Sequence, residues 1–479
     1  MSKNLIYDIH DKPKFSNMLI FAFQQLLAIL AATIAVPTII GLPTQIPAAI
    51  FGAGVGTLIY QLFTRFKSPV FLGSSFAFLN SLGVALAYGY CGILLGSIVA
   101  GLVYVVLAVI IRFVGTNWVS KLMPPVIIGP TVALIGLSLA VNAMGDMVKS
   151  NVAQPNATYN LAALACGLIT FFTVVICSTQ KRYTMPKLIP FIIGIGAGYA
   201  SAAILTLVGD LTGLDYLKVI NYAPFVNNFV DADGSFKGIS AIFSLPHFAL
   251  FEAFGEIADG NVMDLGGVAE VVMAFLPVAL VVFAEHIADH KNLSSIIEHD
   301  LIEDPGLEKT LLGDGIGSIM GTAFGVCPNT TYGESVGCVA ITRNASVATI
   351  TTTAIMCLVL SFISPIMALL QTIPSCVMGG VCLTLYGFIA VSGLKMFKDL
   401  DLNENKNLFV VAAILIAGIG GLTIQIPYAV VGGVVTKTIK ITSIATALIL
   451  GIVTNAVLTK LEKSKLGKEK TAESDDKKE

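Results

Sequence analysis

Apolar runs alternate with short polar segments along almost the whole chain. Runs long enough to cross a bilayer as helices begin near residues 17, 46, 70, 92, 124, 159 and 186, and then near 266, 309, 329, 346, 372, 407 and 438. This pattern predicts an all-α polytopic membrane protein with about 14 transmembrane segments.

Two of these runs cannot be continuous helices. In residues 327–343 (CPNTTYGESVGCVAITR), Pro328 blocks helix propagation and Gly333 loosens the backbone, while the residues between them suit a short extended segment. Residues 68–83 have the same layout, with Pro69 and Gly73. Irregular backbone at membrane depth survives only where it lines a cavity or is buried in protein. Two such segments in corresponding positions of two halves indicate a transporter binding site.

The two halves of the chain resemble each other weakly. Residues 123–141 align with residues 373–391 at a fixed offset, so that Pro124 matches Pro374 and Gly129 matches Gly379. Because seven spans is an odd number, two such halves must have opposite orientations in the membrane. We therefore expect a 7+7 inverted repeat, with a cytoplasmic N-tail (1–15), a first repeat (16–209), an external loop (210–265), a second repeat (266–459) and a disordered cytoplasmic C-tail (460–479).

Composition and charge agree with a membrane protein. Of the 479 residues, 55% are hydrophobic and only 12% are charged, against about 25% charged in soluble domains. Most of the 28 Lys and Arg fall in segments that are cytoplasmic if the N-terminus is inside, so we expect both termini in the cytoplasm and a location in the cell membrane. No basic domain indicates a nucleic-acid partner. The eight cysteines form no C-x-x-C pair that would indicate a zinc site or a disulfide framework.

Carboxylates occur within the apolar runs. Glu334 falls where a helix restarts after Gly333, and Glu285 follows the apolar run FLPVALVVFA. An acid at membrane depth is a candidate for a functional site. Asp289 lies one turn beyond Glu285 on the same helix face. His286 and His290 form a second i, i+4 pair without a third ligand, so we expect no metal site and interpret His290 as the solvated end of a span.

These carboxylates indicate a class of ligand. Carboxylates only accept hydrogen bonds, and no Lys or Arg accompanies them, which disfavours an anion. The helix starts after Gly73 and Gly333 offer backbone N–H groups, at Ser75–Phe76 and Tyr332–Gly333, that suit carbonyl oxygens. Phe76 and Tyr332 offer stacking faces. Donors and acceptors along one planar edge describe a nucleobase, and a buried Glu is a candidate proton carrier.

Five stretches of the chain carry a resemblance to a known family. They are LGSSFAF (72–78), AEHIADHKN (284–292), DPGLEKTLLGDGIGSIMG (304–321), PNTTYGES (328–335) and MGGVCLTLYG (378–387). They resemble the nucleobase–ascorbate transporter family, and within it the bacterial uracil permeases. The family signature reads acid or amide, Asn, any residue, Gly, four residues, Thr, Arg. Here it begins at Glu334 and ends at Arg343, with Ser335 in place of the usual Asn, and Gln25 stands where many relatives have His.

The resemblance implies a core domain and a gate domain, with two short β-strands crossing in the broken third and tenth segments. It also implies a homodimer and proton symport, with the proton as coupling ion and no other cofactor. The substrate-binding positions of the family fall here on Ser75, Phe76, Glu285, Tyr332, Gly333 and Glu334, with Tyr386 as a further aromatic residue near the site. Asp289 occupies a position that is tied to coupling, together with Glu285. Glu rather than Gln at position 334 resembles the carriers of uracil.

Sequence reasoning therefore favours a proton-coupled importer of a nucleobase, most directly uracil, and not an enzyme. Three alternatives remain at this point. The first is a purine carrier of the same fold that transports xanthine. The second is an anion exchanger of the same architecture, which predicts a cationic or carboxylate-free site. The third, a membrane enzyme with paired carboxylates, lacks a nucleophile–base motif and a metal set.

Overall fold

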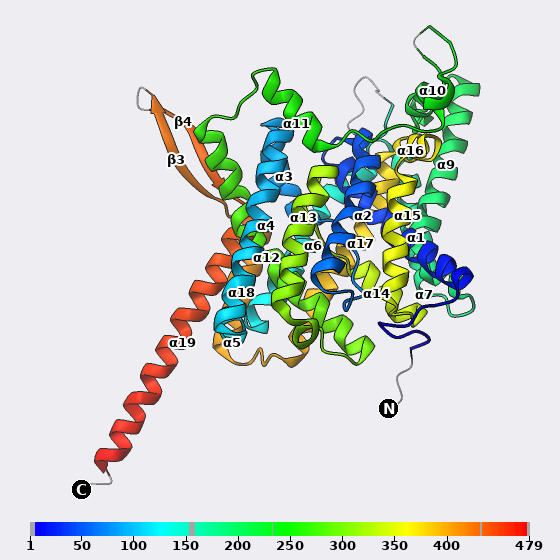
Figure 1. Ribbon diagram of the computed structural model, residues 1–479. Helices are drawn as coiled ribbons and strands as arrows, with labels where there is room; N and C mark the ends of the chain where they lie inside the picture. The colour runs from blue at the N-terminus through cyan, green and yellow to red at the C-terminus, as the bar shows by residue number, and fades with distance from the viewer. Residues whose placement is uncertain (1–4, 153–158, 232, 432–433, 477–479) are drawn as a thin grey trace.

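The computed structural model describes residues 5–152, 159–231, 233–431 and 434–476, and it is mainly helical (Figure 1). Nine helices in this part of the chain are long and apolar enough to cross a membrane. The long apolar helices and their shorter neighbours are α1 (Phe15–Ile39), α2 (Ile46–Phe63), α4 (Gly89–Val114), α6 (Pro125–Met147), α7 (Leu161–Thr179), α9 (Pro190–Thr212), α12 (Leu265–Ile297), α13 (Leu307–Phe324), α15 (Val347–Leu360), α17 (Ser375–Lys395), α18 (Asn405–Ile419) and α19 (Ser443–Asp476). Most of them begin within a few residues of the positions that the apolar pattern predicts.

The two interrupted runs are broken as expected, and the prediction of two short crossing strands is confirmed. The first forms β1 (Leu72–Ser74), a 3-10 turn η2 (Phe76–Phe78) and α3 (Leu79–Leu86), and the second forms β2 (Asn329–Thr331) and α14 (Gly333–Thr342). The two strands pair antiparallel, with Gly73 opposite Thr330. Segments in equivalent positions of two halves that run in opposite directions are what an inverted repeat requires.

Contacts between α6 and α17 show the same internal symmetry. A Cβ atom on Gly393 would lie 2.5 Å from the carbonyl oxygen of Gly129, and one on Gly379 would lie 2.8 Å from the carbonyl oxygen of Ala143. The sequence offset that aligns the two halves pairs Gly129 with Gly379 and Ala143 with Gly393. The contact of Gly393 with Gly129 in one half therefore corresponds to the contact of Ala143 with Gly379 in the other. The start of each helix therefore meets the end of the other, as expected for repeats related by an axis in the membrane plane.

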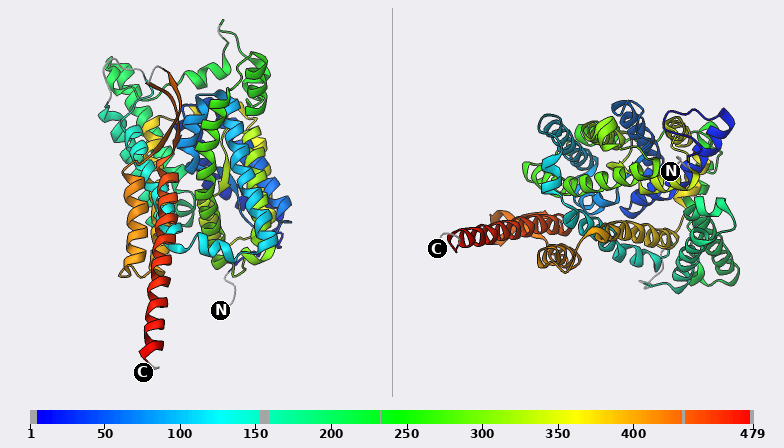
Figure 2. Two further views of the ribbon diagram at one scale, coloured as in Figure 1. Left: turned by 90° about the vertical axis from the view of Figure 1, so that its left-hand side faces the viewer. Right: turned by 90° about the horizontal axis from the view of Figure 1, so that it is seen from below.

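The helices form two packed groups. In the first group, the core, α13 packs against α2 and α4, α15 against α1 and α2, and α12 against α4. In the second group, the gate, α17 packs against α6 and α7, α9 against α7, and α18 against α6 and α19. The right-hand view of Figure 2, in which the molecule is seen from below, shows the two groups side by side. Helices α1 and α12 of the core face the gate, since both also contact gate helices.

The connections gather at opposite ends of the molecule (Figure 1). Both termini lie at one end, where the short helices α5 (Asn117–Leu122) and α8 (Thr184–Leu188) are also found. The long polar stretch after α9 lies at the other end and contains η3 (Asp215–Leu217), α10 (Ala223–Phe229), η4 (Gly238–Ala241) and α11 (Ala249–Ala258), with α16 (Ser364–Gln371) beside α10. Helix α11 packs against α4, and its Glu256 carboxylate accepts hydrogen bonds from the N–H groups of Tyr90 and Cys91 at 3.0 and 3.1 Å.

Two features near the C-terminus differ from the sequence-based expectation. Between α18 and α19 the chain forms an antiparallel hairpin of β3 (Ile424–Val431) and β4 (Val434–Ile441), which the apolar pattern did not predict. The last helix begins after this hairpin, at Ser443, rather than near residue 438. Residues 460–476, which we expected to be disordered, continue α19 as a helix.

Candidate functional site

A cavity of about 430 Å³ lies between the core and the gate. The core lines it with residues of α12, β2 and α14, and the gate lines it with residues of α9 and α17. Along α12, the lining residues Glu285, Asp289 and Asn292 follow one face of the helix toward the end of the molecule that holds both termini. The exposed residues Lys187 and Lys395 mark its mouth at that end.

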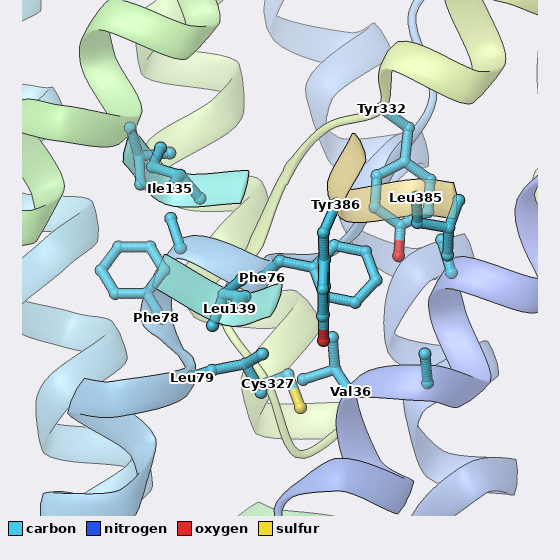
Figure 3. Packing of buried hydrophobic residues seen from close by; sticks show 14 of the residues in the cluster. Val36, Phe76, Phe78, Leu79, Ile135, Leu139, Cys327, Tyr332, Leu385 and Tyr386 are labelled. Atoms are coloured by element: carbon cyan, nitrogen blue, oxygen red, sulfur yellow. The ribbon is translucent and has the colours of Figure 1, made fainter. Parts of the chain in front are cut away.

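The crossing of β1 and β2 fixes the deep end of this cavity. The Tyr332 hydroxyl donates a hydrogen bond to the backbone carbonyl of Ser74 at 3.1 Å, so the residue after β2 is fastened to β1. Gly73 makes room for this contact, because a Cβ atom there would lie 2.7 Å from the Tyr332 hydroxyl oxygen. Phe76 packs edge-on against Tyr386, with ring centroids 5.3 Å apart (Figure 3). The core and the gate thus meet at the deep end through an aromatic contact.

Three carboxylates line the cavity, and they come from two different helices. Glu285 and Asp289 lie on α12, and Glu334 lies in the first turn of α14. Asp289 accepts a hydrogen bond of 2.6 Å from the Thr331 hydroxyl, which fixes it to β2. In the described part of the chain, the Oε2 atom of Glu285 is buried without a hydrogen-bond partner. A buried acceptor without a partner calls for a ligand, a proton or water.

Further hydrogen-bonding groups surround these carboxylates. The Ser74 and Thr330 hydroxyls also lack partners among the described residues, and both residues line the cavity. The first N–H groups of α14 have no acceptor within the helix, as at any helix start, and Gly333 exposes its backbone here. The deep end therefore offers acceptors and donors together, next to the apolar ring of Phe76.

Six of the eight residues predicted from the sequence line this cavity. They are Phe76, Glu285, Asp289, Tyr332, Gly333 and Glu334. The other two do not. Ser75 lies beside the lining residue Ser74, and Tyr386 stands behind Phe76 with its side chain 1% exposed.

Two backbone donors that the sequence suggested for a ligand are already engaged. The Ser75 N–H donates to the Pro328 carbonyl at 2.9 Å, and the Tyr332 N–H donates to the Phe71 carbonyl at 3.1 Å. Both bonds extend the pairing of the crossing strands. That expectation was therefore wrong for these two groups, since a short extended segment in the sequence does not reveal its partner.

The sequence did not reveal that two lysines line the same cavity as the carboxylates. Lys187 of α8 and Lys395 in the last turn of α17 line the same cavity, at its mouth. Each is distant in the sequence from both carboxylate-bearing helices, so only the fold brings them together.

His290 is not the solvated end of a span, because its side chain is fully buried. Its Nε2 atom lies 2.7 Å from the Tyr60 hydroxyl, and its ring stacks on His286 with centroids 4.0 Å apart. His286 in turn lies 2.7 Å from Asp314 and 3.0 Å from the Thr310 hydroxyl. Sequence reasoning missed this buried network, although an acid in the apolar run of α13 was a usable signal. The described residues contain no group of three or more His, Cys, Asp or Glu arranged for a metal ion.

Gln25 and Ser335, the two residues that differ from the family pattern, contact each other. The amide Nε2 of Gln25, in α1, donates a hydrogen bond to the Ser335 hydroxyl in α14, and both side chains are buried. The short side chain of Ser335 is therefore matched to a longer partner at position 25. This pair holds the first turn of α14 against α1.

The known proteins that this chain resembles belong to the family that its sequence motifs indicate. A family model described as Permease family matches residues 16–427. The uracil permease of Bacillus caldolyticus is 35% identical over 95% of this chain and 94% of its own length. The uracil permease of Bacillus subtilis is 35% identical over 96% of both chains, and that of Escherichia coli is 32% identical over 90% of this chain and 91% of its own.

Solved structures share the fold at low sequence identity. The transmembrane domain of a cyanobacterium bicarbonate transporter, BicA, superimposes with a TM-score of 0.54 at 14% identity and covers 94% of this chain and 100% of that one. The anion transporter solute carrier 26 family member A9 from mouse gives a TM-score of 0.56 at 11% identity, over 94% of this chain and 69% of its own.

Proposed function

This chain belongs to the permease family, the nucleobase–ascorbate transporters that its motifs indicate, and from that premise we propose that it imports uracil together with a proton. The observation that carries the proposal is the cavity between core and gate, where Glu285 and Glu334 face one space beside the start of α14 and the ring of Phe76. The names of the most similar relatives support uracil as the substrate.

The deep end of the cavity complements the edge of a uracil ring. Uracil carries two ring N–H donors and two carbonyl acceptors in one plane. Glu285 and Glu334 accept hydrogen bonds from the ring N–H groups, since carboxylates are acceptors only. The first N–H groups of α14 donate to a carbonyl, and the partial positive charge of a helix N-terminus favours that oxygen. Phe76 covers one face of the ring.

A proton supplies the coupling. Three carboxylates share one cavity, and their mutual repulsion is relieved when one of them binds a proton. Glu285 is suited to this role because its Oε2 atom has no partner among the described residues, whereas Asp289 is held by Thr331. Asp289, one helical turn away, assists by setting the local negative charge.

Transport proceeds by alternating access of the core against the gate. The residues that bind the base lie on core elements, and the gate contributes the opposing wall through Phe191 and Phe388. The cavity opens at the end that holds both termini, and we place that end in the cytoplasm in accordance with the distribution of Lys and Arg. The structure then represents the state that releases the base. We further propose that the transporter is a homodimer in the cell membrane.

Equilibrium binding to the purified protein tests the substrate assignment. Unlabelled uracil, xanthine, thymine and chloride are each added separately as competitors of labelled uracil. We expect unlabelled uracil to displace the label, and xanthine and chloride to fail at an excess of about a hundredfold over the uracil concentration that suffices. Preferential binding of xanthine would assign the site to a purine, and binding of neither base would favour an anion carrier of the same fold.

Exchange across a membrane tests the role of Glu285. In the Glu285→Gln variant we expect uracil exchange between two equal pools to survive while uptake driven by a proton gradient is lost. Gradient-driven uptake at the wild-type rate would contradict the assignment of the proton to Glu285.

A further inference from the structure

A short extended segment before α1 lies against the core and has no part in the function described above. The sequence marked residues 5–11 only as part of a cytoplasmic tail. In the structure, their backbone pairs with residues 343–347, which connect α14 to α15. Tyr7 forms a parallel β-bridge with Asn344. We call residues 5–11 the N-terminal strap; they lie at the end of the molecule that holds both termini (Figure 1).

The N-terminal strap supplies hydrogen-bond partners to two helix ends. The last C=O groups and the first N–H groups of a helix have no partner within the helix itself. At the end of α14, the Arg343 carbonyl accepts a hydrogen bond of 2.8 Å from the N–H of Ile6. At the start of α15, the N–H of Val347 donates to the Ile9 carbonyl at 3.1 Å. The strap therefore fixes the connection between these two helices through the backbone.

Ile9 anchors the strap among buried side chains of the core. Its side chain is 6% exposed and lies in a buried apolar cluster, whereas the side chain of Ile6 is 60% exposed. The members of this cluster from α12 and α14 are Leu293, Ile297, Val336 and Val339. The one fully enclosed side chain of the strap thus belongs to the same cluster as the two helices that carry Glu285 and Glu334.

Helix α14 presents opposite faces to this cluster and to the cavity. Its cavity-lining residues recur at helical spacing from Glu334 to Ile341. Val336 and Val339 lie on the other side of the helix, since successive residues are rotated by about 100°. The helix has only 10 residues. A shift of its buried face is therefore passed on to the face that meets the ligand.

We propose that the N-terminal strap holds α14 in the position that binds the base, and that Ile9 is its positioning residue. The hydrogen bond between Gln25 and Ser335 fastens the first turn of α14 to α1, and the strap fastens its last turn. The strap pairs with and packs against α12, α14 and α15, which all belong to the core, so it moves with the core during alternating access. This inference rests on the proposed function, because Glu334 and the first N–H groups of α14 are what the strap positions.

Equilibrium binding of labelled uracil to purified variants tests the proposal, at a temperature where each variant is folded. We expect Ile9→Ala to weaken binding at least about fivefold and Ile9→Val, which removes a single carbon, to give an intermediate affinity. Ile6→Ala is the matched control, because it removes the same side chain from solvent and keeps the backbone hydrogen bond to Arg343. It should bind as the wild type does. If Ile9→Ala does not fold, the comparison of Ile9→Val with Ile6→Val replaces it.

The Glu334→Gln background shows whether Ile9 acts through α14. If the strap positions Glu334, the loss of affinity caused by Ile9→Ala should be smaller in this background than in the wild type. In uracil exchange between equal pools, Ile9→Ala should raise KM and leave the maximal rate near that of the wild type. Equal losses of affinity in both backgrounds would contradict positioning through α14.

Hydrogen exchange of the α14 amides tests the strap without any ligand. We expect faster exchange of residues 333–342 in Ile9→Ala than in Ile6→Ala, and equal exchange in the two variants would contradict the proposal. A lower melting temperature of Ile9→Ala with unchanged uracil affinity would reduce the strap to a stabiliser of the fold and would also overturn it. Failure of the wild type to bind uracil would instead overturn the proposed function, and the exchange of α14 would still decide whether the strap holds this helix.

Discussion

Glu334 combines two roles at the residue scale. It is the acid of the first turn of α14, where negative charge is stabilised by the helix N-terminus. It also lines the same cavity as Glu285. Its position thus makes the same carboxylate a stabiliser of the restarted helix and a hydrogen-bond acceptor for a ligand.

Replacing Glu334 by Gln separates these two roles. The amide keeps one acceptor oxygen but loses the charge, and hydrogen bonds to charged groups contribute about 1.5–3 kcal/mol. We therefore expect uracil affinity to fall by about 10- to 150-fold, with a small effect on thermal stability. Equilibrium binding and a melting curve of the purified variant measure both quantities. Unchanged uracil affinity would exclude Glu334 from the site.

The contact between Gln25 and Ser335 makes a second prediction at this scale. Ser335→Ala leaves the buried Gln25 amide without its partner, which costs about 1–3 kcal/mol. Gln25→Leu in the same background removes the unsatisfied group, so the double variant should recover part of that loss. A double-mutant cycle on the free energy of unfolding should give a coupling of at least about 0.5 kcal/mol. Additive effects would show that the pair does not interact.

The residues of the site differ in how far the sequence revealed them. Glu285 and Glu334 were identified because an acid within an apolar run is costly in a membrane and is rarely kept without a function. The burial of His290 depends on Tyr60, which comes from another helix, and could not be read from its own neighbours. The lysines at the mouth were missed for the same reason. Local sequence shows what a residue can do, but its partners are set by the tertiary fold.

At the element scale, α6 and α17 depend on close contact of their backbones. Gly393→Ala would place a methyl group 2.5 Å from the Gly129 carbonyl oxygen, which forces the two helices apart. We expect a loss of about 1–3 kcal/mol in stability, measured as a lower melting temperature in detergent. Gly387→Ala on the same helix is the matched control, because a Cβ atom there has no neighbour within 4 Å. Equal melting temperatures of the two variants would contradict the close packing.

The loop between α12 and α13 makes a pH-dependent prediction. The Lys67 ammonium lies 2.8 Å from Asp304 and lowers the pKa of that carboxyl below its ordinary value. A lowered pKa in the folded state stabilises the protein above the ordinary carboxyl pKa of about 3.9, and this contribution is lost as the pH falls below it. The pair is exposed to solvent, so the effect should be well under about 1 kcal/mol.

Asp304→Asn tests this interpretation of the loop. At neutral pH and low salt we expect the variant to be slightly less stable than the wild type, and we expect the difference to vanish below about pH 4. The variant Glu303→Gln, which changes the exposed neighbouring acid, should leave the pH dependence as it is. A difference between Asp304→Asn and the wild type that persists at low pH would assign the effect to something other than the ion pair.

The elements that sequence reasoning located best were those with a strong local signal. Pro69 and Pro328 marked the breaks before β1 and β2, and the apolar runs marked the long helices. The β3–β4 hairpin also had a signal, since Gly432 and Gly433 separate two runs rich in β-branched residues. We interpreted its second run as the start of a helix because it merges with the apolar run of α19. In an apolar chain, strands and helices of this length are hard to distinguish by periodicity.

At the scale of the whole molecule, the inverted repeat explains why the binding site lies where it does. The antiparallel pairing of β1 and β2 brings one broken segment from each half to the same depth. The core then carries the site, and the two symmetry-related backbone contacts between α6 and α17 hold the gate together. A cavity between the two groups, open at one end, is the arrangement that alternating access requires.

Gradient-driven uptake by proteoliposomes that contain the purified protein tests the central claim most directly. Labelled uracil is supplied outside, with and without an inward proton gradient, and excess unlabelled uracil or xanthine is added as competitor. We expect uracil to accumulate above equilibrium only with the gradient, and we expect unlabelled uracil, but not xanthine, to abolish this accumulation. Accumulation that does not depend on the proton gradient, or that is blocked by xanthine and not by uracil, would contradict it.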